Sequence, residues 1–350
     1  SAPFSDVELM GVTDNEAILG IGDQGVGGMA ISIGKLALYC VGAGIHPART
    51  LPISLDVGTD NQELLDDPWY LGWRQHRLRG DAYLAIVDEF VEAARAVFPG
   101  AVIQWEDFHK DIAFQVLDRH RNHLPSFNDD IQGTGAVAAA AVHAAARISG
   151  EEFRDCRTIV YGAGAAGVGI ARQIRRQLQQ EGVEGEALAR AIITLDSRGV
   201  VSDDRDDLDK NKRDFAWPAE WVEEIGLSVE DRRNLAKVVD AYKGNVLIGT
   251  SGQAASFTEE VVRNAAKHSD HPVILPMSNP TDISEATPAD IMKWTDGTAL
   301  VATGSPFDPV EVGGDERRIG QAHNVFVFPG IGLGTMVSGA TEITGSMIGA

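Results

Sequence analysis

Short apolar runs that end in glycine, serine, asparagine or proline recur through the second half of the chain. The run TIVY at residues 158–161 leads into a glycine turn, a helical pattern from Ala165 to about Gln180, and the run AIITLD that ends at Asp196. This order predicts a strand, a helix and a second strand. Four further runs, VLIGTSG, PVILPMSNP, ALVATGS and NVFVFPG, follow with helical segments between most of them. They predict an α/β fold with a parallel sheet.

A second α/β unit is predicted upstream. The runs LPISLDVGTD and AVIQWED flank DAYLAIVDEFVEAARAVF, whose apolar residues recur at helical spacing behind Asp81, the expected N-cap. The alanine-rich stretch 133–148 is too short to cross a bilayer and contains His143 and Arg147, so we expect a buried helix there. No other apolar run is expected to reach membrane-spanning length.

Length and composition narrow the class of protein. A chain of 350 residues exceeds the usual single core, which favours two domains. With 30 basic and 51 acidic side chains, the net charge of -21 repels phosphate backbones, so we expect no nucleic-acid partner. Two cysteines cannot form a disulfide framework, and no secretory leader is visible. A cytoplasmic location without a membrane partner is therefore expected, and the abrupt ends of the chain suggest a fragment.

The segment GAGAAG predicts a dinucleotide site. Its glycines follow a strand at the mouth of a helix, where backbone amides can approach a pyrophosphate, and Asp196 at the end of the next strand can accept hydrogen bonds from a ribose. NAD is favoured because Asp196 would repel a 2′-phosphate, whereas Arg198, Lys210, Lys212 and Arg213 could reach one and leave NADP open. The predicted cofactor residues here are Gly162, Gly164, Ala165, Ala166, Gly167, Asp196, Ser197 and Arg198.

Four carboxylates predict a metal site. Glu106 and Asp107 follow the strand-like VIQW, and Asp129 and Asp130 follow SFN. Adjacent residues in a strand face opposite ways, so Glu106 and Asp107 can both face one ion only where the strand gives way to a loop. An all-oxygen set suits Mg²⁺ or Mn²⁺, and no histidine or cysteine pair has a spacing that indicates zinc.

Lys35 is a candidate general base. It lies in MAISIGKLALY with apolar residues on both sides. Such a surrounding is expected to place the ammonium near a dry pocket, which would lower its pKa toward that of a useful base. A lone lysine in this setting is more often one whose stem covers apolar surface while its head reaches water.

Nine motifs together resemble a known family. They are GIGDQGVGGMAISIGKLALY, LDVGTDN, DPWYLGWR, WEDF, FNDDIQGT, GAGAAG, SNPT, GSPFDPV and NVFVFPGIGLG. In this order they cover nearly the whole chain and resemble the NAD(P)-dependent malic enzymes of the large-subunit type. Malolactic enzymes, which act on the same substrate, are close relatives of that family.

The resemblance implies roles for individual residues. Glu106, Asp107 and Asp130 would hold Mg²⁺ or Mn²⁺, Lys35 would be the general base, and Asp129 would support that proton transfer. The implied substrate-binding residues are Lys35, Asn279 and Asn324, and the implied further cofactor residues are Ser251 and Asn279.

The resemblance also implies how the chain is organised. A Rossmann-type NAD(P)-binding domain at 129–322 would be inserted in a catalytic α/β domain made of 1–128 and 323–350. The protein would act on malate as a homodimer or homotetramer.

Three functions follow as hypotheses. The first is oxidative decarboxylation of L-malate to pyruvate and CO₂ with reduction of NAD(P). The second is malolactic chemistry, in which bound NAD is reduced and reoxidised and lactate leaves. The third is a truncated or inactive nucleotide-binding and oligomerising module, because the family's end segments are expected to be missing and Ala17 stands where the family usually has an arginine. Two other departures from the family pattern are His323 in place of one of an asparagine pair and the lack of a tyrosine in the family's general-acid motif.

Overall fold

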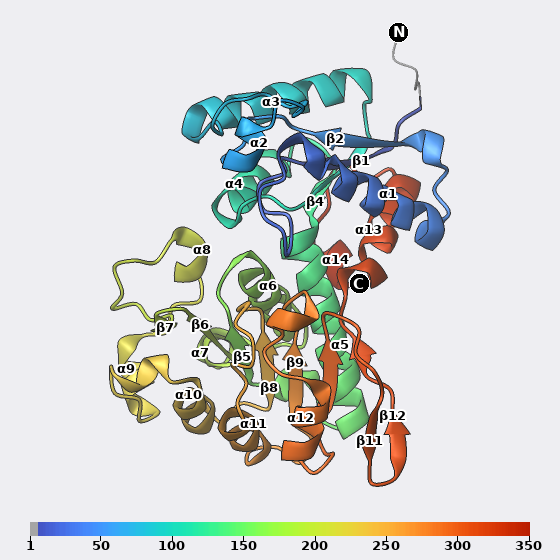
Figure 1. Cartoon of the computed structure of the whole chain (residues 1–350). Helices are drawn as coiled ribbons and strands as arrows, with labels where there is room; N and C mark the ends of the chain where they lie inside the picture. The colour runs from blue at the N-terminus through green and yellow to red at the C-terminus, as the bar shows by residue number, and fades with distance from the viewer. Residues whose placement is uncertain (1–5) are drawn as a thin grey trace. The chain divides into compact units, whose positions relative to one another are not determined.

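The computed structural model describes residues 6–350, which form two compact units (Figure 1). Unit 1 contains residues 6–133, 324–348 and 350, and unit 2 contains residues 134–323 and 349. The assignment of a catalytic domain to 1–128 and 323–350, and of a cofactor domain to 129–322, stays a prediction about function.

Unit 1 is built on a parallel sheet of four strands in the order β2–β1–β3–β4. The strands are β1 (Leu9–Thr13), β2 (Thr50–Ser54), β3 (Val102–Trp105) and β4 (Ser126–Asn128). Every residue of β1, β3 and β4 is buried, as expected for strands covered on both faces. Because the strands are parallel, their carboxyl ends lie along one edge of the sheet.

Helices surround this sheet. They are α1 (Met29–Ala43), α2 (Gln62–Asp66), α3 (Gly80–Val97), α4 (Lys110–His120), α13 (Phe328–Ser338) and α14 (Gly345–Gly349), with short 3₁₀ turns at Gly25–Gly28, Pro47–Arg49 and Asn324–Phe326. A π-helical turn, Asp129–Gly133, follows β4. Helix α3 confirms the predicted helix, but Arg79 is its N-cap and Asp81 lies in the first turn without a capping hydrogen bond. The predicted Asp81 cap is therefore wrong.

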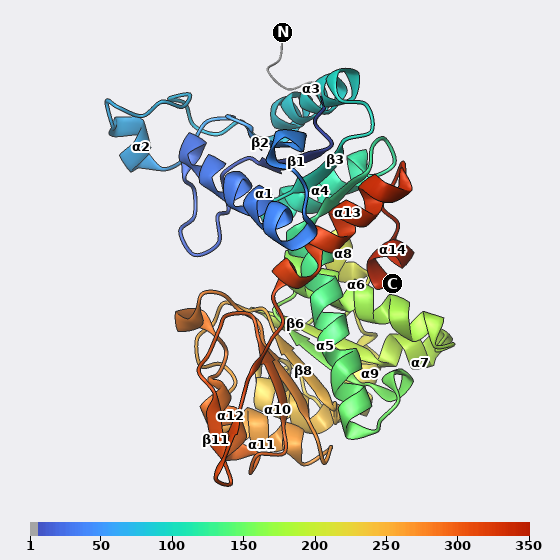
Figure 2. The same ribbon diagram turned by 90° about the vertical axis from the view of Figure 1, so that its right-hand side faces the viewer.

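The predicted strand at NVFVFPG is also wrong. This segment forms the 3₁₀ turn Asn324–Phe326 and the first residues of α13, where Pro329 occupies one of the first two helical positions. Proline suits that position because its missing amide hydrogen would have no partner inside the helix. Helix α13 packs beside α1 (Figure 2). A Cβ on Gly332 would lie 2.5 Å from the ring of Tyr39, so the two helices are close here. The apolar run is thus buried by helix packing and adds no strand to a sheet.

Unit 2 is built on a sheet of seven strands in the order β13–β10–β9–β8–β5–β6–β7. All neighbours are parallel except β6 and β7. The strands are β5 (Thr158–Tyr161), β6 (Ile192–Asp196), β7 (Gly199–Val200), β8 (Val246–Gly249), β9 (Val273–Pro276), β10 (Leu300–Thr303) and β13 (Gly320–Gln321), and a hairpin of β11 (Val310–Val312) and β12 (Asp315–Arg317) lies apart from the sheet. The predicted parallel sheet and the strand that ends at Asp196 are confirmed.

Helices α5 and α6 cover one face of this sheet, and α10, α11 and α12 cover the other (Figure 2). The helices of unit 2 are α5 (Thr134–Ser149), α6 (Ala165–Gln180), α7 (Gly185–Arg190), α8 (Lys210–Arg213), α9 (Ala219–Glu224), α10 (Leu235–Tyr242), α11 (Glu259–Ala266) and α12 (Pro288–Trp294). Ile159, Ile193, Leu247 and Ile274 on neighbouring strands are completely or almost completely buried beneath the helices. Helix α5 confirms the helix predicted from the alanine-rich stretch.

The order of strands in unit 2 marks a ligand position. Strand β5 has β6 on one side and β8 on the other, so the chain reverses its direction across the sheet at β5. In sheets of this kind the loops at the carboxyl ends of the strands separate at such a point and leave a crevice in which ligands bind. The GAGAAG segment follows β5 and therefore lies at this crevice.

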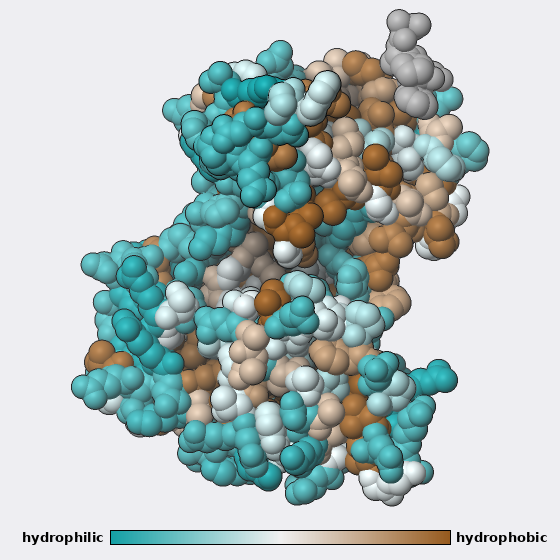
Figure 3. Space-filling model, in the orientation of Figure 1, coloured by the Kyte–Doolittle hydropathy of each residue, from teal (hydrophilic) through white to brown (hydrophobic). Residues whose placement is uncertain are grey.

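Helix α1 has an exposed apolar side. Ile33, Leu38 and Val41 are exposed, and Figure 3 shows hydrophobic residues gathered over the part of unit 1 that contains this helix. The stretch Gly25–Ala43, 19 residues long, is apolar enough to cross a membrane by length and composition, contrary to the expectation from sequence. Core helices pass the same test, so this is weak evidence for a membrane span, and Lys35 within it makes ion pairs with two buried acids.

Candidate functional site

The four predicted carboxylates lie together at one edge of the sheet in unit 1. Strands β3 and β4 are neighbours, with Trp105 opposite Asn128. Glu106 and Asp107 follow the first of these strands, and Asp129 and Asp130 follow the second. The paired register of two strands therefore brings together acids that are separated by more than twenty residues along the chain.

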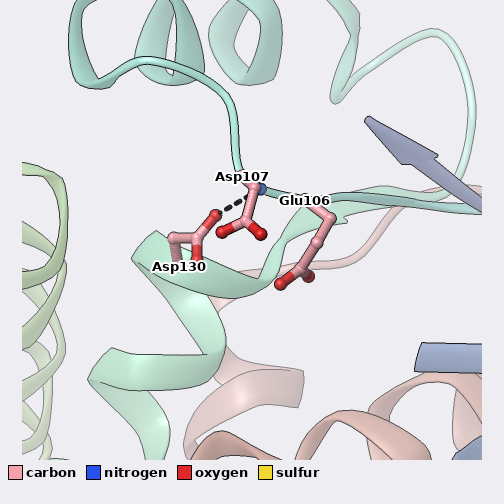
Figure 4. Close-up of side chains that lie close together, drawn as sticks. All are labelled: Glu106, Asp107 and Asp130. Carbon is pink, nitrogen blue, oxygen red and sulfur yellow. Dashed lines mark hydrogen bonds between the residues drawn. The ribbon is translucent and has the colours of Figure 1, made fainter. Parts of the chain in front are cut away.

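The backbone at Asp107 allows two adjacent acids to share a site. Its φ of 54° lies in the left-handed region, which residues other than glycine rarely adopt. This turn ends the alternation of the strand, and one oxygen each from Glu106, Asp107 and Asp130 lies within 4.8 Å of the others (Figure 4). The Asp107 amide also donates to Asp130 Oδ2 over 2.9 Å, which ties the two loops together.

The charges of these acids fit a cation. Burial, followed by repulsion from the charges of Asp130 and Glu106, raises the pKa of Asp107 to about 9. Burial, followed by repulsion from the charge of Glu106, raises the pKa of Asp130 to about 7. Burial likewise raises the pKa of Glu106. Asp107 Oδ1 is buried and has no hydrogen-bond partner among the described residues. Three crowded carboxylates with an unpartnered oxygen are the environment that a hard divalent ion such as Mg²⁺ or Mn²⁺ would stabilise.

Lys35 extends from α1 into the same cluster. Its Nζ lies 2.9 Å from Glu106 Oε1 and 2.7 Å from Asp129 Oδ2, and 4.8 Å from the centre of the Phe328 ring. Burial would lower the pKa of Lys35, but the charges of Asp129, Glu106 and Asp130 outweigh it and raise that pKa. The expectation of a lowered pKa is therefore wrong for this arrangement, because the apolar neighbours in sequence gave no sign of the carboxylates around the amine.

Asp129 connects the lysine to the last part of unit 1. The carboxylate is completely buried, and its Oδ2 accepts hydrogen bonds from Lys35 Nζ and, over 2.6 Å, from Asn324 Nδ2. Asn324 is 195 residues away along the chain and lies in the 3₁₀ turn before α13. The structure thus brings Lys35, Asp129 and Asn324 together, whereas Asn279 belongs to unit 2.

Two residues of this cluster were missed from sequence. Gln104 Nε2 donates to Glu106 Oε2 over 2.8 Å, and the Tyr39 hydroxyl donates a short hydrogen bond to Gln104 Oε1. Both side chains are completely buried. Alternation along β3 places Gln104 on the same side as Glu106, and Tyr39 is one helical turn after Lys35, so both spacings could have identified them. Together they orient Glu106 so that Oε1 faces Lys35.

The glycine turn of unit 2 has the geometry of a backbone ligand site. Gly162 has a φ of 116°, and a Cβ there would lie 2.5 Å from the carbonyl carbon of Thr250. A Cβ on Gly167 would lie 1.9 Å from the Gly162 oxygen, so only glycine allows α6 to begin this close to β5. A Cβ on Gly164 would meet nothing within 4 Å. Open space at Gly164 and the first-turn amides of α6, which have no carbonyl partner within the helix, suit a pyrophosphate.

Asp196 ends β6 within a network of cations. Arg205 contacts both of its carboxylate oxygens at 2.9 Å, and Lys212 Nζ contacts Oδ2 at 2.7 Å. Burial would raise the pKa of Asp196, but these bonds outweigh it and lower that pKa. The predicted neighbour Arg198 donates its backbone amide to Asp196 and directs its side chain to Asp207, 3.3 Å away. Arg205 was not among the cations expected here.

The remaining predicted cofactor residues lie in three loops of unit 2. Ser197 lies in the turn between β6 and β7, Ser251 follows β8, and Asn279 follows β9. Asn279 Oδ1 accepts a short hydrogen bond from Ser305, which follows β10. Ser251 donates both its amide and its hydroxyl to Glu285, a buried acid that sequence reasoning did not single out.

Known proteins resemble the chain over its whole length. The family model described as "Malic enzyme, N-terminal domain" matches residues 1–121, and the model described as "Malic enzyme, NAD binding domain" matches residues 131–350. The crystal structure of the Entamoeba histolytica malic enzyme is similar in fold, with a TM-score of 0.73 at 24% identity over 98% of this chain and 60% of that one.

Curated relatives are more similar in sequence. An NAD-dependent malic enzyme of Sodalis glossinidius is 45% identical over 99% of this chain, and NAD-dependent malic enzyme 3 of Bacillus subtilis is 47% identical over 98% of it. The chain spans 61% of the length of each of these relatives. With both family models matched in order and this degree of identity, the chain belongs to the malic enzyme family.

Proposed function

We propose that the chain carries the centre for oxidative decarboxylation of L-malate to pyruvate and CO₂, with NAD as oxidant and Mg²⁺ or Mn²⁺ as the metal. The observation that carries this proposal is the contact of Lys35 with both Glu106 and Asp129 beside the acids at 107 and 130. A basic group next to a cation site is what removal of a proton from a 2-hydroxy acid requires. The names of the similar NAD-dependent enzymes support the same reaction.

Glu106, Asp107 and Asp130 would hold the metal in this proposal. When bound, the metal supplies Lewis-acid polarisation of the substrate's hydroxyl and, after oxidation, of its carbonyl. Gln104 keeps one oxygen of Glu106 engaged, so that the other faces the interior of the cluster. Glu106 and Asp107 are buried and Asp130 is partly buried, which limits the access of water and strengthens the electrostatic interactions within the site.

Lys35 would accept the hydroxyl proton of malate as hydride leaves for the nicotinamide, and Asp129 would hold and stabilise the resulting ammonium. A neutral amine is needed for this step. The surrounding carboxylates raise the pKa of Lys35, and charge compensation of Glu106 and Asp130 by a cation would reduce that effect. Base function and metal occupancy are coupled in this way. Tyr39 is unsuited to donate a proton, because its hydroxyl is buried and bonded to Gln104 and burial raises its pKa well above 10.

NAD is proposed as the preferred cofactor, on the names of the relatives and the glycine turn. Arg205 and Lys212 surround Asp196 and would temper its repulsion of a 2′-phosphate. Discrimination against NADP is therefore expected to be moderate.

Malolactic chemistry is the second candidate function, and dinucleotide binding without turnover is the third candidate function. One assay separates them: reduced nicotinamide, pyruvate and lactate are measured with L-malate and Mn²⁺, separately with NAD and with NADP. Pyruvate in equal amount to reduced cofactor supports the proposal. Lactate without net reduced cofactor would support malolactic chemistry, and binding without product would support the inactive module.

We also infer that the protein acts in the cytoplasm without a membrane and assembles as a homodimer or homotetramer. Exposed apolar side chains on α1, Ile33, Leu38 and Val41, support an assembled form. Analytical ultracentrifugation tests this inference, and a monomer at micromolar concentration would contradict it.

A further inference from the structure

Glu285 is a buried acid of unit 2 that does not belong to the carboxylate cluster of unit 1. It lies between β9 and α12 and is completely buried. A buried carboxylate is costly unless hydrogen bonds compensate it, so its partners indicate why the fold retains it.

Four donors from two loops converge on this carboxylate. The amide and hydroxyl of Ser251 each donate to Oε1 over 2.8 Å, the hydroxyl of Ser278 donates to Oε1 over 2.5 Å, and the amide of Ser278 lies 3.3 Å from Oε2. All four donors are uncharged, and a carboxylate can accept them all because it has only acceptor sites when ionised. Glu285 therefore connects the loop after β8 to the loop after β9.

The connection is built into the sheet itself. A Cβ on Gly249, the last residue of β8, would lie 2.5 Å from the carboxyl carbon of Glu285, so a larger residue here would displace the Glu285 side chain. Ser278 Oγ also accepts the amide of Gly252 over 2.9 Å, which joins the two loops directly. These contacts hold Ser251 and Ser278 in place, and Ser278 is the residue directly before Asn279.

Strand order indicates which part of a dinucleotide these loops would serve. Asp196 ends β6, the glycine turn follows β5, and β8 and β9 continue on the other side of β5. If the ribose of adenosine lies at β6 and the pyrophosphate lies at β5, the nicotinamide half lies over β8 and β9. We propose that Glu285 is a positioning residue that holds the β8 and β9 loops in the conformation that binds the nicotinamide half of the cofactor. This inference rests on the proposed function.

The test compares Glu285→Gln with wild type in three measurements on the full chain. Glutamine has the same shape but places a donor among donors, so hydrogen exchange in the cofactor-free protein should rise about tenfold at 250–253 and 277–280 and stay unchanged in β5. By calorimetry, the Kd for NAD should rise about tenfold, while the Kd for AMP, which carries only the adenosine half, should stay within about twofold.

Glu260→Gln is the matched control, because this exposed acid on α11 belongs to the same unit, and it should leave all three measurements unchanged. Ser278→Ala removes one donor and should shift exchange and NAD affinity in the same direction by a smaller factor, which keeps the test intact if the glutamine variant folds poorly. Unchanged exchange in the two loops, or equal weakening of NAD and AMP, would overturn the inference. A wild type that binds neither nucleotide would instead overturn the proposed function, and the exchange experiment would still decide the role of Glu285.

Discussion

The two predicted sites shift the pKa values of their carboxylates in opposite directions. In unit 1 burial and mutual repulsion raise the pKa of Asp107 to about 9 and of Asp130 to about 7, with Lys35 as the cation in contact with the cluster. In unit 2 Asp196 is bonded to both Arg205 and Lys212, which outweigh burial and lower its pKa. In the first cluster the ionised forms of the acids are not compensated and are therefore disfavoured, whereas the second acid is already compensated.

This difference teaches what each site requires from its ligand. The ionised form of such an uncompensated cluster is stabilised by a cation from outside, which is the expected role of Mg²⁺ or Mn²⁺. A compensated carboxylate adds little net charge, so recognition of the cofactor would depend on hydrogen bonds and on the backbone amides of the glycine turn. Substitutions at the two sites should therefore differ in sign as well as size.

The largest effect is expected from Lys35→Met. Loss of the proposed base should reduce kcat by about 10²–10⁴-fold. Removal of its positive charge from the carboxylates should leave Mn²⁺ binding as tight or tighter. Steady-state kinetics and Mn²⁺ titration by electron paramagnetic resonance measure the two quantities. Full turnover in this variant would exclude Lys35 as the base.

Next in size is Asp107→Asn. The variant should weaken Mn²⁺ binding by about a hundredfold, because it removes one charged oxygen ligand. It should also stabilise the metal-free protein by about 1 kcal/mol, because three mutually repelling buried acids become two. Calorimetric metal titration and urea unfolding in EDTA test both parts. A metal-free variant less stable than wild type would contradict the idea that the acids of this cluster are uncompensated.

Asp196→Asn should have the opposite effect on stability. It leaves Lys212 without this carboxylate and Arg205 with Asp207 alone, and should lower the free energy of unfolding by about 1–2 kcal/mol, less than for a fully buried pair because water screens the site. It should also improve the ratio of NADP to NAD affinity. Urea unfolding and nucleotide titration measure these effects, and an unchanged ratio would remove Asp196 from cofactor selection.

The smallest effect is a pH dependence at Asp23, a compensated acid in unit 1. Burial would raise its pKa, but hydrogen bonds from Arg77 and from backbone amides hold it at about 2. A lowered pKa contributes stability above the unfolded value of about 3.8 that is lost as pH falls toward 2. Asp23→Asn should thus cost about 1 kcal/mol at pH 7 after solvent screening, and less at pH 3. Urea unfolding of wild type and variant at pH 7 and at pH 3 measures this cost. An equal cost at the two pH values would contradict the prediction.

Local pattern predicted much of the fold. Apolar runs identified β5, β6, β8, β9 and β10, and the alanine-rich stretch identified α5, because strand and helix periods are properties of neighbouring residues. The same reasoning mistook 324–330 for a strand, since an apolar run of that length is equally compatible with a buried helix. The packing of α13 on α1 favours the helix over the strand for this segment.

The sequence predicted which acids and which lysine belong to the candidate site in unit 1, but not the direction in which their surroundings shift the pKa of the lysine. Glu106, Asp107, Asp129 and Asp130 stand out in sequence because two pairs of acids lie at the ends of predicted elements, and ligands bind at the carboxyl ends of parallel strands. The raised pKa of Lys35 could not be predicted from sequence. The direction of the shift depends on Glu106 and Asp129, which are 71 and 94 residues away along the chain and approach the amine only in the folded protein. Glu285 gave no signal at all, since nothing near it in sequence marks it as buried.

By itself the sequence determined the α/β class, the order of motifs and the chemical types available at each strand end. Those features follow from short-range periodicity and residue chemistry. Only the tertiary structure decided which acids share a cluster, which acid is compensated, and that Asn324 meets Asp129 across 195 residues. The physical reason is that charge interaction and desolvation depend on distance and burial, which chain separation does not encode.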